Sequence, residues 1–385
     1  MEFVRAASAP VCQGSPVTAP DRLLDALLRF NRGEPEADGT VGNPGFAPAR
    51  PGPTDRRMAR HGDPNRREGG LSERFDIRCD PATRQRFGVL TISPIGARSP
   101  SQRPGHITLF LPPWNCSVRD PTTLLRAREI ARQTQTTVIA VNLPGLDGSS
   151  GLTRPQRSAF RTGTGLQEVG SAVLRMLAAS GVTSADVAAV SLGARAGAGV
   201  LASAAHSPLV IERAVLVDPA GAAVMSVREL MHRFFADGRL LEAAQRFPHD
   251  SAFIAAAGLD HSALSRKVDY FSRVLRPLLT WGGAHAYYAT YLRAMCAGTL
   301  GHDIQQGLRS DTLMQVTLVH GGRSRIAPSR EIDALLDAVA APLRARLHLE
   351  RHPAASHAGF DHPAILGPIV QRALILGRGR EARTL

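Results

Sequence analysis

Long apolar runs, cysteine and lysine are all scarce in this chain of 385 residues. No window reaches the roughly 18 consecutive apolar residues that a membrane span needs, and the N-terminus lacks the basic start and apolar stretch of a secretory leader. The four cysteines, Cys12, Cys79, Cys116 and Cys296, show no CxxC spacing and no histidines at zinc-ligand spacing. We therefore expect a cytoplasmic protein without a membrane span, a metal site or a disulfide framework.

Basic residues outnumber acidic ones, and arginine supplies nearly all of the positive charge. The net charge is +13, and Lys267 is the single lysine. A clustered basic face would attract phosphate groups, but these arginines are scattered along the whole chain. Because this pattern fits a GC-rich coding bias, nucleic-acid binding is not expected.

Residues 1–70 differ in composition from the rest of the chain. They hold one short amphipathic run, Asp21–Arg32, followed by a tract rich in Pro, Gly, Arg and Asp, Gly33–Gly70. Such a tract buries too little apolar surface to offset the entropy of ordering it, so we predict a flexible, mostly disordered extension. Met58 is an in-frame methionine, and a start there would exclude residues 1–57 from the native protein.

From residue 71 onward, short apolar runs alternate with segments of helical periodicity. Strands are predicted at Glu73–Arg78, Phe87–Ser93, His106–Leu111, Thr137–Val141, Val187–Val190, Arg213–Val217, Gln315–Val319 and Arg346–Glu350. Helices are predicted at Pro121–Gln133, Gly165–Ser180, Leu192–Ala204, Glu331–Ala341 and Pro363–Leu376. This alternation is typical of an α/β fold, in which helices flank a mostly parallel central sheet.

The strand signal stops between residues 222 and 311, where apolar residues recur at helical spacing. We predict a helical insert, 222–311, after the sixth strand; the core is then 71–221 and 312–378, and the tail is 379–385. A little over half of the aromatic residues lie in the insert: Phe234, Phe235, Phe247, Phe253, Tyr270, Phe271, Trp281, Tyr287, Tyr288 and Tyr291. Such residues are usually helical core, but their concentration also suits an apolar pocket.

The stretch Asp186–Gly199 carries the strongest chemical signal. Its sequence, DVAAVSLGARAGAG, runs from a short apolar strand through Ser191 into a helix of small residues. A sharp strand-to-helix turn lifts a serine hydroxyl out of the sheet and requires small neighbours, here Ala189 and Gly193. The next amide, that of Leu192, would lie at the helix N-terminus, where oxyanions are stabilised. A turn that only caps the helix is the alternative.

This stretch resembles the nucleophile elbow of the α/β-hydrolase family, G-x-S-x-G, with Ala189 in place of the first glycine. The stretch VIAVNLPGLDGSS, Val138–Ser150, is similar to the family's D-x-P-G-x-G-x-S segment, with Asn142 in place of the acidic residue. The resemblance covers about residues 72–378. It implies an α/β-hydrolase fold in which the helical insert forms a cap over the substrate pocket.

The segment HITLFLPPWNCS, His106–Ser117, stands where the family has its HG-x oxyanion loop. Pro112 and Pro113 replace the histidine and glycine, and neither proline has an N–H to donate. Trp114 is the first available donor after the strand, so the resemblance implies an oxyanion hole formed by the amides of Trp114 and Leu192. A rigid Pro-Pro turn with Trp114 in the core is the alternative.

Near the C-terminus, PAASHAGFDHPAIL, Pro353–Leu366, resembles the histidine loop of the family, and His357 matches its histidine. Imidazole is suited to this position because it can take the serine proton and return it near neutral pH. His352 and His362 lie close by in the sequence. The loop match selects His357 as the base.

The acid departs from the usual pattern of the family. The stretch HGGRSRIAP, His320–Pro328, stands where the family has G-x-x-D-x-I-V-P, and Ser324 occupies the place of the carboxylate. A known variation places the acid one strand earlier, where VLVDPAG puts Asp218 at a strand end. Asp218 is therefore the predicted third member of the triad, although an aspartate there can also cap the turn. A Ser–His dyad or an inactive site is the third option.

The resemblance implies hydrolysis of an ester, thioester or related acyl bond of a hydrophobic small molecule, with no metal or organic cofactor. Ser191 would form an acyl-enzyme, His357 would move the proton, and Asp218 would orient the charged histidine. Two alternatives stay open: an acyltransferase that uses the same acyl-enzyme, and a non-catalytic binding or scaffold protein that has the same fold.

Overall fold

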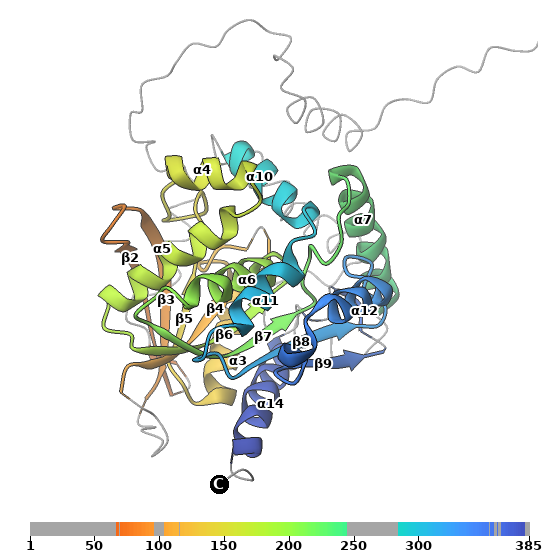
Figure 1. Ribbon diagram of the computed structural model, residues 1–385. Helices are drawn as coiled ribbons and strands as arrows, with labels where there is room; N and C mark the ends of the chain where they lie inside the picture. The colour runs from red at the N-terminus through yellow and green to blue at the C-terminus, as the bar shows by residue number, and fades with distance from the viewer. Residues whose placement is uncertain are drawn as a thin grey trace, which may run out of the picture. The chain divides into compact units, whose positions relative to one another are not determined.

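The computed structural model describes residues 67–68, 70–95, 104–114, 116–244, 284–353, 355–357, 360 and 363–381. Within these ranges a nine-stranded sheet runs in the order β1-β2-β3-β5-β4-β6-β7-β8-β9 (Figure 1). The predicted N-terminal extension lies outside the described residues, apart from its last few. None of the helices in the described ranges combines the length and apolarity that crossing a bilayer requires.

The sheet is antiparallel at one edge and parallel across the rest. Strands β1, β2 and β3 pair antiparallel with their neighbours, as do β3 and β5, and every pair from β5 through β9 is parallel. The predicted mostly parallel sheet is therefore confirmed. The strands are β1 (Arg67–Glu68), β2 (Leu71–Cys79), β3 (Arg86–Pro94), β4 (His106–Leu111), β5 (Val138–Val141), β6 (Ser184–Val190), β7 (Val210–Val217), β8 (Gln315–Gly321) and β9 (Leu347–His352).

Helices cover both faces of the sheet. Helices α3 and α14 pack against each other on one face, whereas α5, α6 and α11 pack together on the other (Figure 1). Helix α11 lies within the range predicted as the insert. The helices are α3 (Pro121–Thr134), α4 (Arg154–Arg161), α5 (Gly165–Ala179), α6 (Leu192–Ala204), α7 (Val227–Ala244), α10 (Ala284–Cys296), α11 (Leu300–Leu308), α12 (Ser329–Ala338), α13 (Ala341–Arg344) and α14 (Pro363–Glu381).

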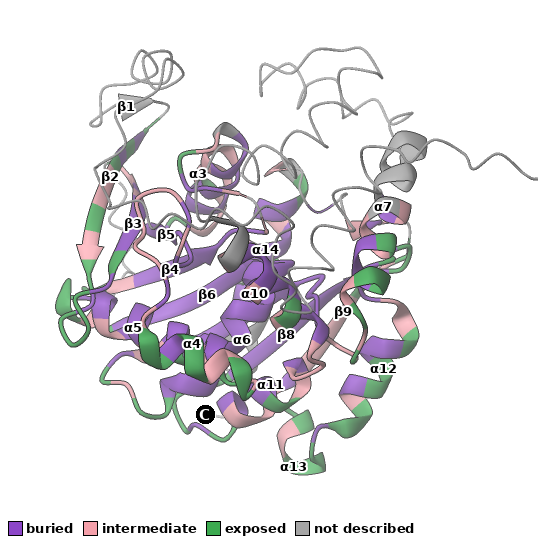
Figure 2. Ribbon diagram, turned by 90° about the horizontal axis from the view of Figure 1, so that it is seen from above, coloured by how far each residue is buried: buried purple, intermediate pink, exposed green. Residues whose placement is uncertain are grey.

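The central strands are buried on both faces, as strands of parallel sheets usually are (Figure 2). Alternate residues face opposite sides. Ala188 and Val190 of β6 join the hydrophobic cluster that includes residues of α3 and α14, while Ala189 lies against Gly197 of α6. Strand β6 therefore ends in the middle of the sheet, between two helical layers. This sets the position of Ser191, the residue that directly follows it.

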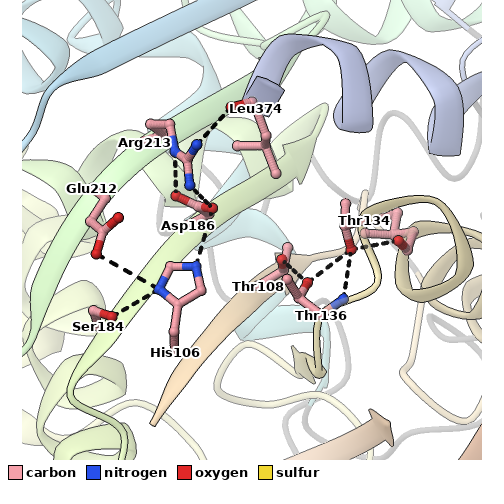
Figure 3. Close-up of polar contacts among 10 residues, drawn as sticks. His106, Thr108, Thr134, Thr136, Ser184, Asp186, Glu212, Arg213 and Leu374 are labelled. Carbon is pink, nitrogen blue, oxygen red and sulfur yellow. Dashed lines mark hydrogen bonds and ion pairs between the residues drawn. The ribbon is translucent and has the colours of Figure 1, made fainter. Parts of the chain in front are cut away.

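A network of charged and polar side chains lies near the amino ends of β4, β6 and β7 (Figure 3). Arg213 donates to both carboxylate oxygens of Asp186, at 3.0 and 2.7 Å, and to the carbonyl of Leu374 in α14 at 2.7 Å. His106 contacts Ser184 Oγ at 2.8 Å and Asp186 Oδ2 at 3.3 Å. Because these charges are paired and hydrogen-bonded, Asp186 and Arg213 can lie buried within strands.

Candidate active site

Ser191 occupies the turn between β6 and α6, as the sequence predicted. Its backbone has φ 57° and ψ −119°, a conformation that residues with a side chain rarely adopt. The Ser191 N–H donates to the carbonyl of Val217 at 2.9 Å, and this bond ties the turn to the end of β7. The side chain is shielded from solvent, since Ser191 is 2% exposed.

The small residues around Ser191 are required by close packing. A Cβ atom at Gly193 would lie 2.1 Å from the carbonyl oxygen of Leu111 and 2.5 Å from that of Pro112, so no larger residue fits there. Ala189 replaces the first glycine of the family's elbow, and a Cβ at Gly197 would lie 3.1 Å from the Ala189 methyl. The absence of a side chain at Gly197 therefore leaves room for the additional methyl at position 189.

The three predicted triad side chains lie in contact. His357 Nε2 is 2.9 Å from Ser191 Oγ, and His357 Nδ1 is 2.6 Å from Asp218 Oδ2. An ionised carboxylate only accepts hydrogen bonds, so the proton of a neutral imidazole would lie on Nδ1. Nε2 is then free to accept the hydrogen bond of the serine hydroxyl.

Asp218 follows β7 directly and is fully buried. Its Oδ1 accepts the Gly321 N–H at 3.0 Å, and its Oδ2 accepts the Ser324 hydroxyl at 2.6 Å in addition to contacting His357. Ser324, which stands in the place of the family's usual acid, therefore contacts the carboxylate that comes from the earlier strand. These donors compensate for the burial of the charge and hold both carboxylate oxygens in place.

A second carboxylate near the histidine was not predicted from the sequence. Asp237, a buried residue of α7, accepts the backbone N–H of His357 at 3.3 Å and that of Arg325 at 3.1 Å, both on Oδ1. It therefore links the histidine loop to the loop that follows β8. A single aspartate in a long helical segment carries no sequence signal of such a role.

The two predicted oxyanion donors, the amides of Leu192 and Trp114, belong to two segments that meet at Gly193. Leu192 is the first residue of α6, where a backbone N–H has no acceptor within the helix. The turn after β4 passes over this first helical turn, with the carbonyls of Leu111 and Pro112 against Gly193. Trp114, two residues after Pro112, therefore carries its amide on a segment that packs beside the serine turn.

Asn142, which stands in place of the family's acidic residue, joins three segments. Its Oδ1 accepts the N–H of Val118 at 2.8 Å, and its Nδ2 donates to the carbonyl of Asp147 and to the hydroxyl of Ser117. A carboxylate could not donate the last two bonds. The asparagine therefore holds the segment after β4 against the loop after β5.

Aromatic rings from the predicted insert lie beside the histidine. The ring of Phe234 in α7 is centred 6.1 Å from the His357 ring and 5.6 Å from the Trp114 ring. The ring of Tyr288 in α10 also lies beside Trp114, with 5.7 Å between ring centroids. Five other aromatic residues of the insert lie outside the described residues: Phe247, Phe253, Tyr270, Phe271 and Trp281.

The alternative histidines do not contact this group in the described part of the chain. His352 Nε2 lies 2.8 Å from Glu350 Oε1 at the end of β9, and its ring packs on Phe360. His362 lies outside the described residues. The described ranges also contain no group of three or more His, Cys, Asp or Glu side chains that could together hold a metal ion.

No protein-family model and no curated protein matches this sequence. Among solved structures, one from a study of carboxylesterases of the thaumarchaeon Nitrososphaera gargenis is 13% identical, with a TM-score of 0.51, and covers 79% of this chain and 100% of its own. A hydrolase from Pseudomonas aeruginosa PA01 is 16% identical, with a TM-score of 0.46 and coverages of 79% and 98%. A thioesterase domain from the curacin biosynthetic pathway is 14% identical, with a TM-score of 0.44 and coverages of 77% and 99%.

At this level of identity the likeness defines the fold alone. The sheet order, the helical layers and the similarity to the first of these structures together give the class: the chain has the α/β-hydrolase fold. The resemblance predicted from the sequence motifs is confirmed at the level of the fold.

Proposed function

We propose that the protein is a serine hydrolase that cleaves an ester, thioester or related acyl bond of a hydrophobic small molecule through an acyl-enzyme on Ser191. One observation carries the proposal: Ser191 Oγ, both ring nitrogens of His357 and Asp218 Oδ2 form a chain with separations of 2.9 and 2.6 Å. The strained backbone at Ser191 supports catalysis over a scaffold role, because such strain costs about 1–3 kcal/mol and is found mainly at functional sites.

In the proposed reaction, Ser191 Oγ attacks the substrate carbonyl while His357 Nε2 takes the hydroxyl proton. Asp218 fixes the histidine tautomer and stabilises the imidazolium that forms, with its own orientation held by Gly321 and Ser324. His357 then returns the proton to the leaving group. A water molecule, deprotonated by the same nitrogen, releases the acid.

The amides of Leu192 and Trp114 are the proposed donors to the oxyanion that forms at the attacked carbonyl. One such donor contributes about 3 kcal/mol to lowering the barrier. The packing of the segment after β4 against Gly193 supports this pairing, because Gly193 directly follows Leu192 and Trp114 lies two residues after Pro112. The aromatic side chains of Phe234, Trp114 and Tyr288 support a hydrophobic acyl group as the substrate.

Turnover of acyl esters and thioesters tests the proposal. The purified protein should hydrolyse p-nitrophenyl esters or acyl thioesters, and Ser191→Ala should abolish this turnover while the protein stays folded. Reactions run with a competing alcohol or amine should yield mainly the free acid. Mainly acylated nucleophile would identify acyl transfer instead, and equal turnover by wild type and Ser191→Ala would remove Ser191 from the chemistry.

A further inference from the structure

Two buried polar atoms beside the candidate active site have no hydrogen-bond partner in the part of the chain that the structure describes. They are the indole Nε1 of Trp114 and the phenol Oη of Tyr288. Their rings lie 5.7 Å apart with an interplanar angle of 66°, and Phe234 connects the Trp114 ring to the ring of His357. Both atoms therefore belong to the aromatic group that adjoins the proposed base.

A neighbouring tyrosine shows that helix α10 can satisfy a buried hydroxyl. Tyr291 is buried like Tyr288, and its hydroxyl donates to the carbonyl of Pro144 at 2.8 Å. The ring of Tyr287 packs over Gly145 and Gly151. Through these contacts, the two tyrosines hold α10 against the loop after β5. Tyr288 is therefore held in place by its helix, and its hydroxyl has no acceptor among the described residues.

Unpaired buried donors need an explanation, because buried polar side-chain atoms almost always have a partner. Tyr288 is 1% exposed, and this burial raises its pKa well above the usual value, so the hydroxyl stays protonated at neutral pH. An indole N–H can only donate. Among the described residues, the site thus presents two neutral donors on neighbouring rings and no acceptor for either.

We propose that the Trp114 indole N–H and the Tyr288 hydroxyl bind a neutral oxygen in the acyl chain of the substrate, such as a keto, hydroxyl or ether oxygen. The inference rests on the proposed hydrolase function. Both donors are uncharged, whereas a desolvated carboxylate would require a cationic partner. Trp114 would contact the substrate twice: its backbone amide would bind the scissile carbonyl, and its indole the oxygen a few bonds away.

Esters that differ by one keto group test this specificity. The probes are p-nitrophenyl hexanoate, its 3-, 4- and 5-oxo derivatives, and the mono-p-nitrophenyl ester of adipic acid, each corrected for uncatalysed hydrolysis. For each protein, kcat/KM of every oxo ester is divided by that of the hexanoate. Because the intrinsic reactivity of an ester is the same for all variants, it cancels when these ratios are compared.

In the wild type, at least one oxo ester should be preferred over the hexanoate. That preference should fall about tenfold in Tyr288→Phe and in Trp114→Phe, since each change removes one donor and leaves the substrate oxygen unpaired. Tyr291→Phe is the matched control on the same helix and should keep the preference. Three results would overturn the proposal: an unchanged preference in both test variants, no preferred oxo ester, or a kcat/KM for the adipate ester that is higher than for the oxo esters.

Failure of the specificity proposal can be told apart from failure of the hydrolase proposal. Turnover of the hexanoate without any effect of the keto group refutes only the specificity. Absence of turnover with every probe, together with no adduct on Ser191 after treatment with a fluorophosphonate, refutes both.

Thermal unfolding gives a readout that does not use substrate. Tyr288→Phe removes an unpaired hydroxyl, so its Tm should equal or exceed that of the wild type. Tyr291→Phe breaks the bond to Pro144 and should lower Tm by roughly 2–4 °C. An equal fall in the two variants would mean that Tyr288 already has a partner in the free protein, and this outcome would also overturn the proposal.

Discussion

Replacement of His357 by glutamine should lower kcat/KM for a p-nitrophenyl ester by roughly 10⁵-fold or more. Glutamine retains hydrogen-bonding groups but cannot take the serine proton and return it. The measurement is steady-state kinetics together with the thermal unfolding temperature of each variant. A retained Tm would show that the loss is chemical.

His352→Gln is the matched control for this prediction. His352 lies in the same region of the chain, but it contacts Glu350 and Phe360 and not the serine. Its replacement should change kcat/KM by less than about threefold, the scale of a substitution away from the reacting groups. A loss as large as that of His357→Gln would show that His357 is wrongly assigned as the base.

Asp218→Asn should lower kcat by about 10⁴-fold, the scale seen when a triad acid becomes an amide. Asparagine cannot stabilise an imidazolium, and its amide can hold the histidine in the wrong tautomer. All three contacts of the carboxylate, to Gly321, Ser324 and His357, depend on its acceptor oxygens. The measurement is kcat of the folded variant with a saturating ester.

Ser324→Ala controls for indirect effects at this site. It removes one hydrogen bond to Asp218 and leaves the charge in place, so we expect a loss of about tenfold at most. A rate for Asp218→Asn equal to that of the wild type would exclude Asp218 as the acid. The buried Asp237, which contacts the histidine loop from α7, would then be the carboxylate to test.

The three residues of the proposed triad could be predicted because each follows a strand of the sheet. Ser191 and Asp218 directly follow β6 and β7, whose apolar runs are plain in the sequence. In a parallel sheet the carboxyl ends of neighbouring strands lie at the same edge, so residues far apart in the sequence meet there. The short loop after β9 adds His357, for which the local motif was the signal.

The starts of two strands could not be predicted from apolar periodicity. Strand β6 begins at Ser184 and β7 at Val210, each three residues before the predicted start, because Asp186 interrupts the apolar pattern in β6 and the pair Glu212 and Arg213 interrupts it in β7. The salt bridge between Asp186 and Arg213 makes burial of their charges possible, but this pairing exists only in the folded sheet. The local sequence therefore gives no sign of this pairing.

Helix α4 was missed because its only large apolar residue is Phe160. The signal that could have found it is the capping box, in which Thr153 and Gln156 hydrogen-bond to each other's backbone N–H, with a proline in the first turn. The sequence gives no such signal for the Tyr288 hydroxyl, because its lack of a partner among the described residues is a property of the folded chain.

The central claim is that Ser191 is a nucleophile activated by His357, and covalent labelling tests it most directly. A fluorophosphonate should add one phosphonyl group per chain by intact mass, and peptide mapping should place it on Ser191. Ser191→Ala should take up none, and His357→Gln should react far more slowly. Absence of labelling in the folded wild type, or an adduct on another residue, would contradict the account.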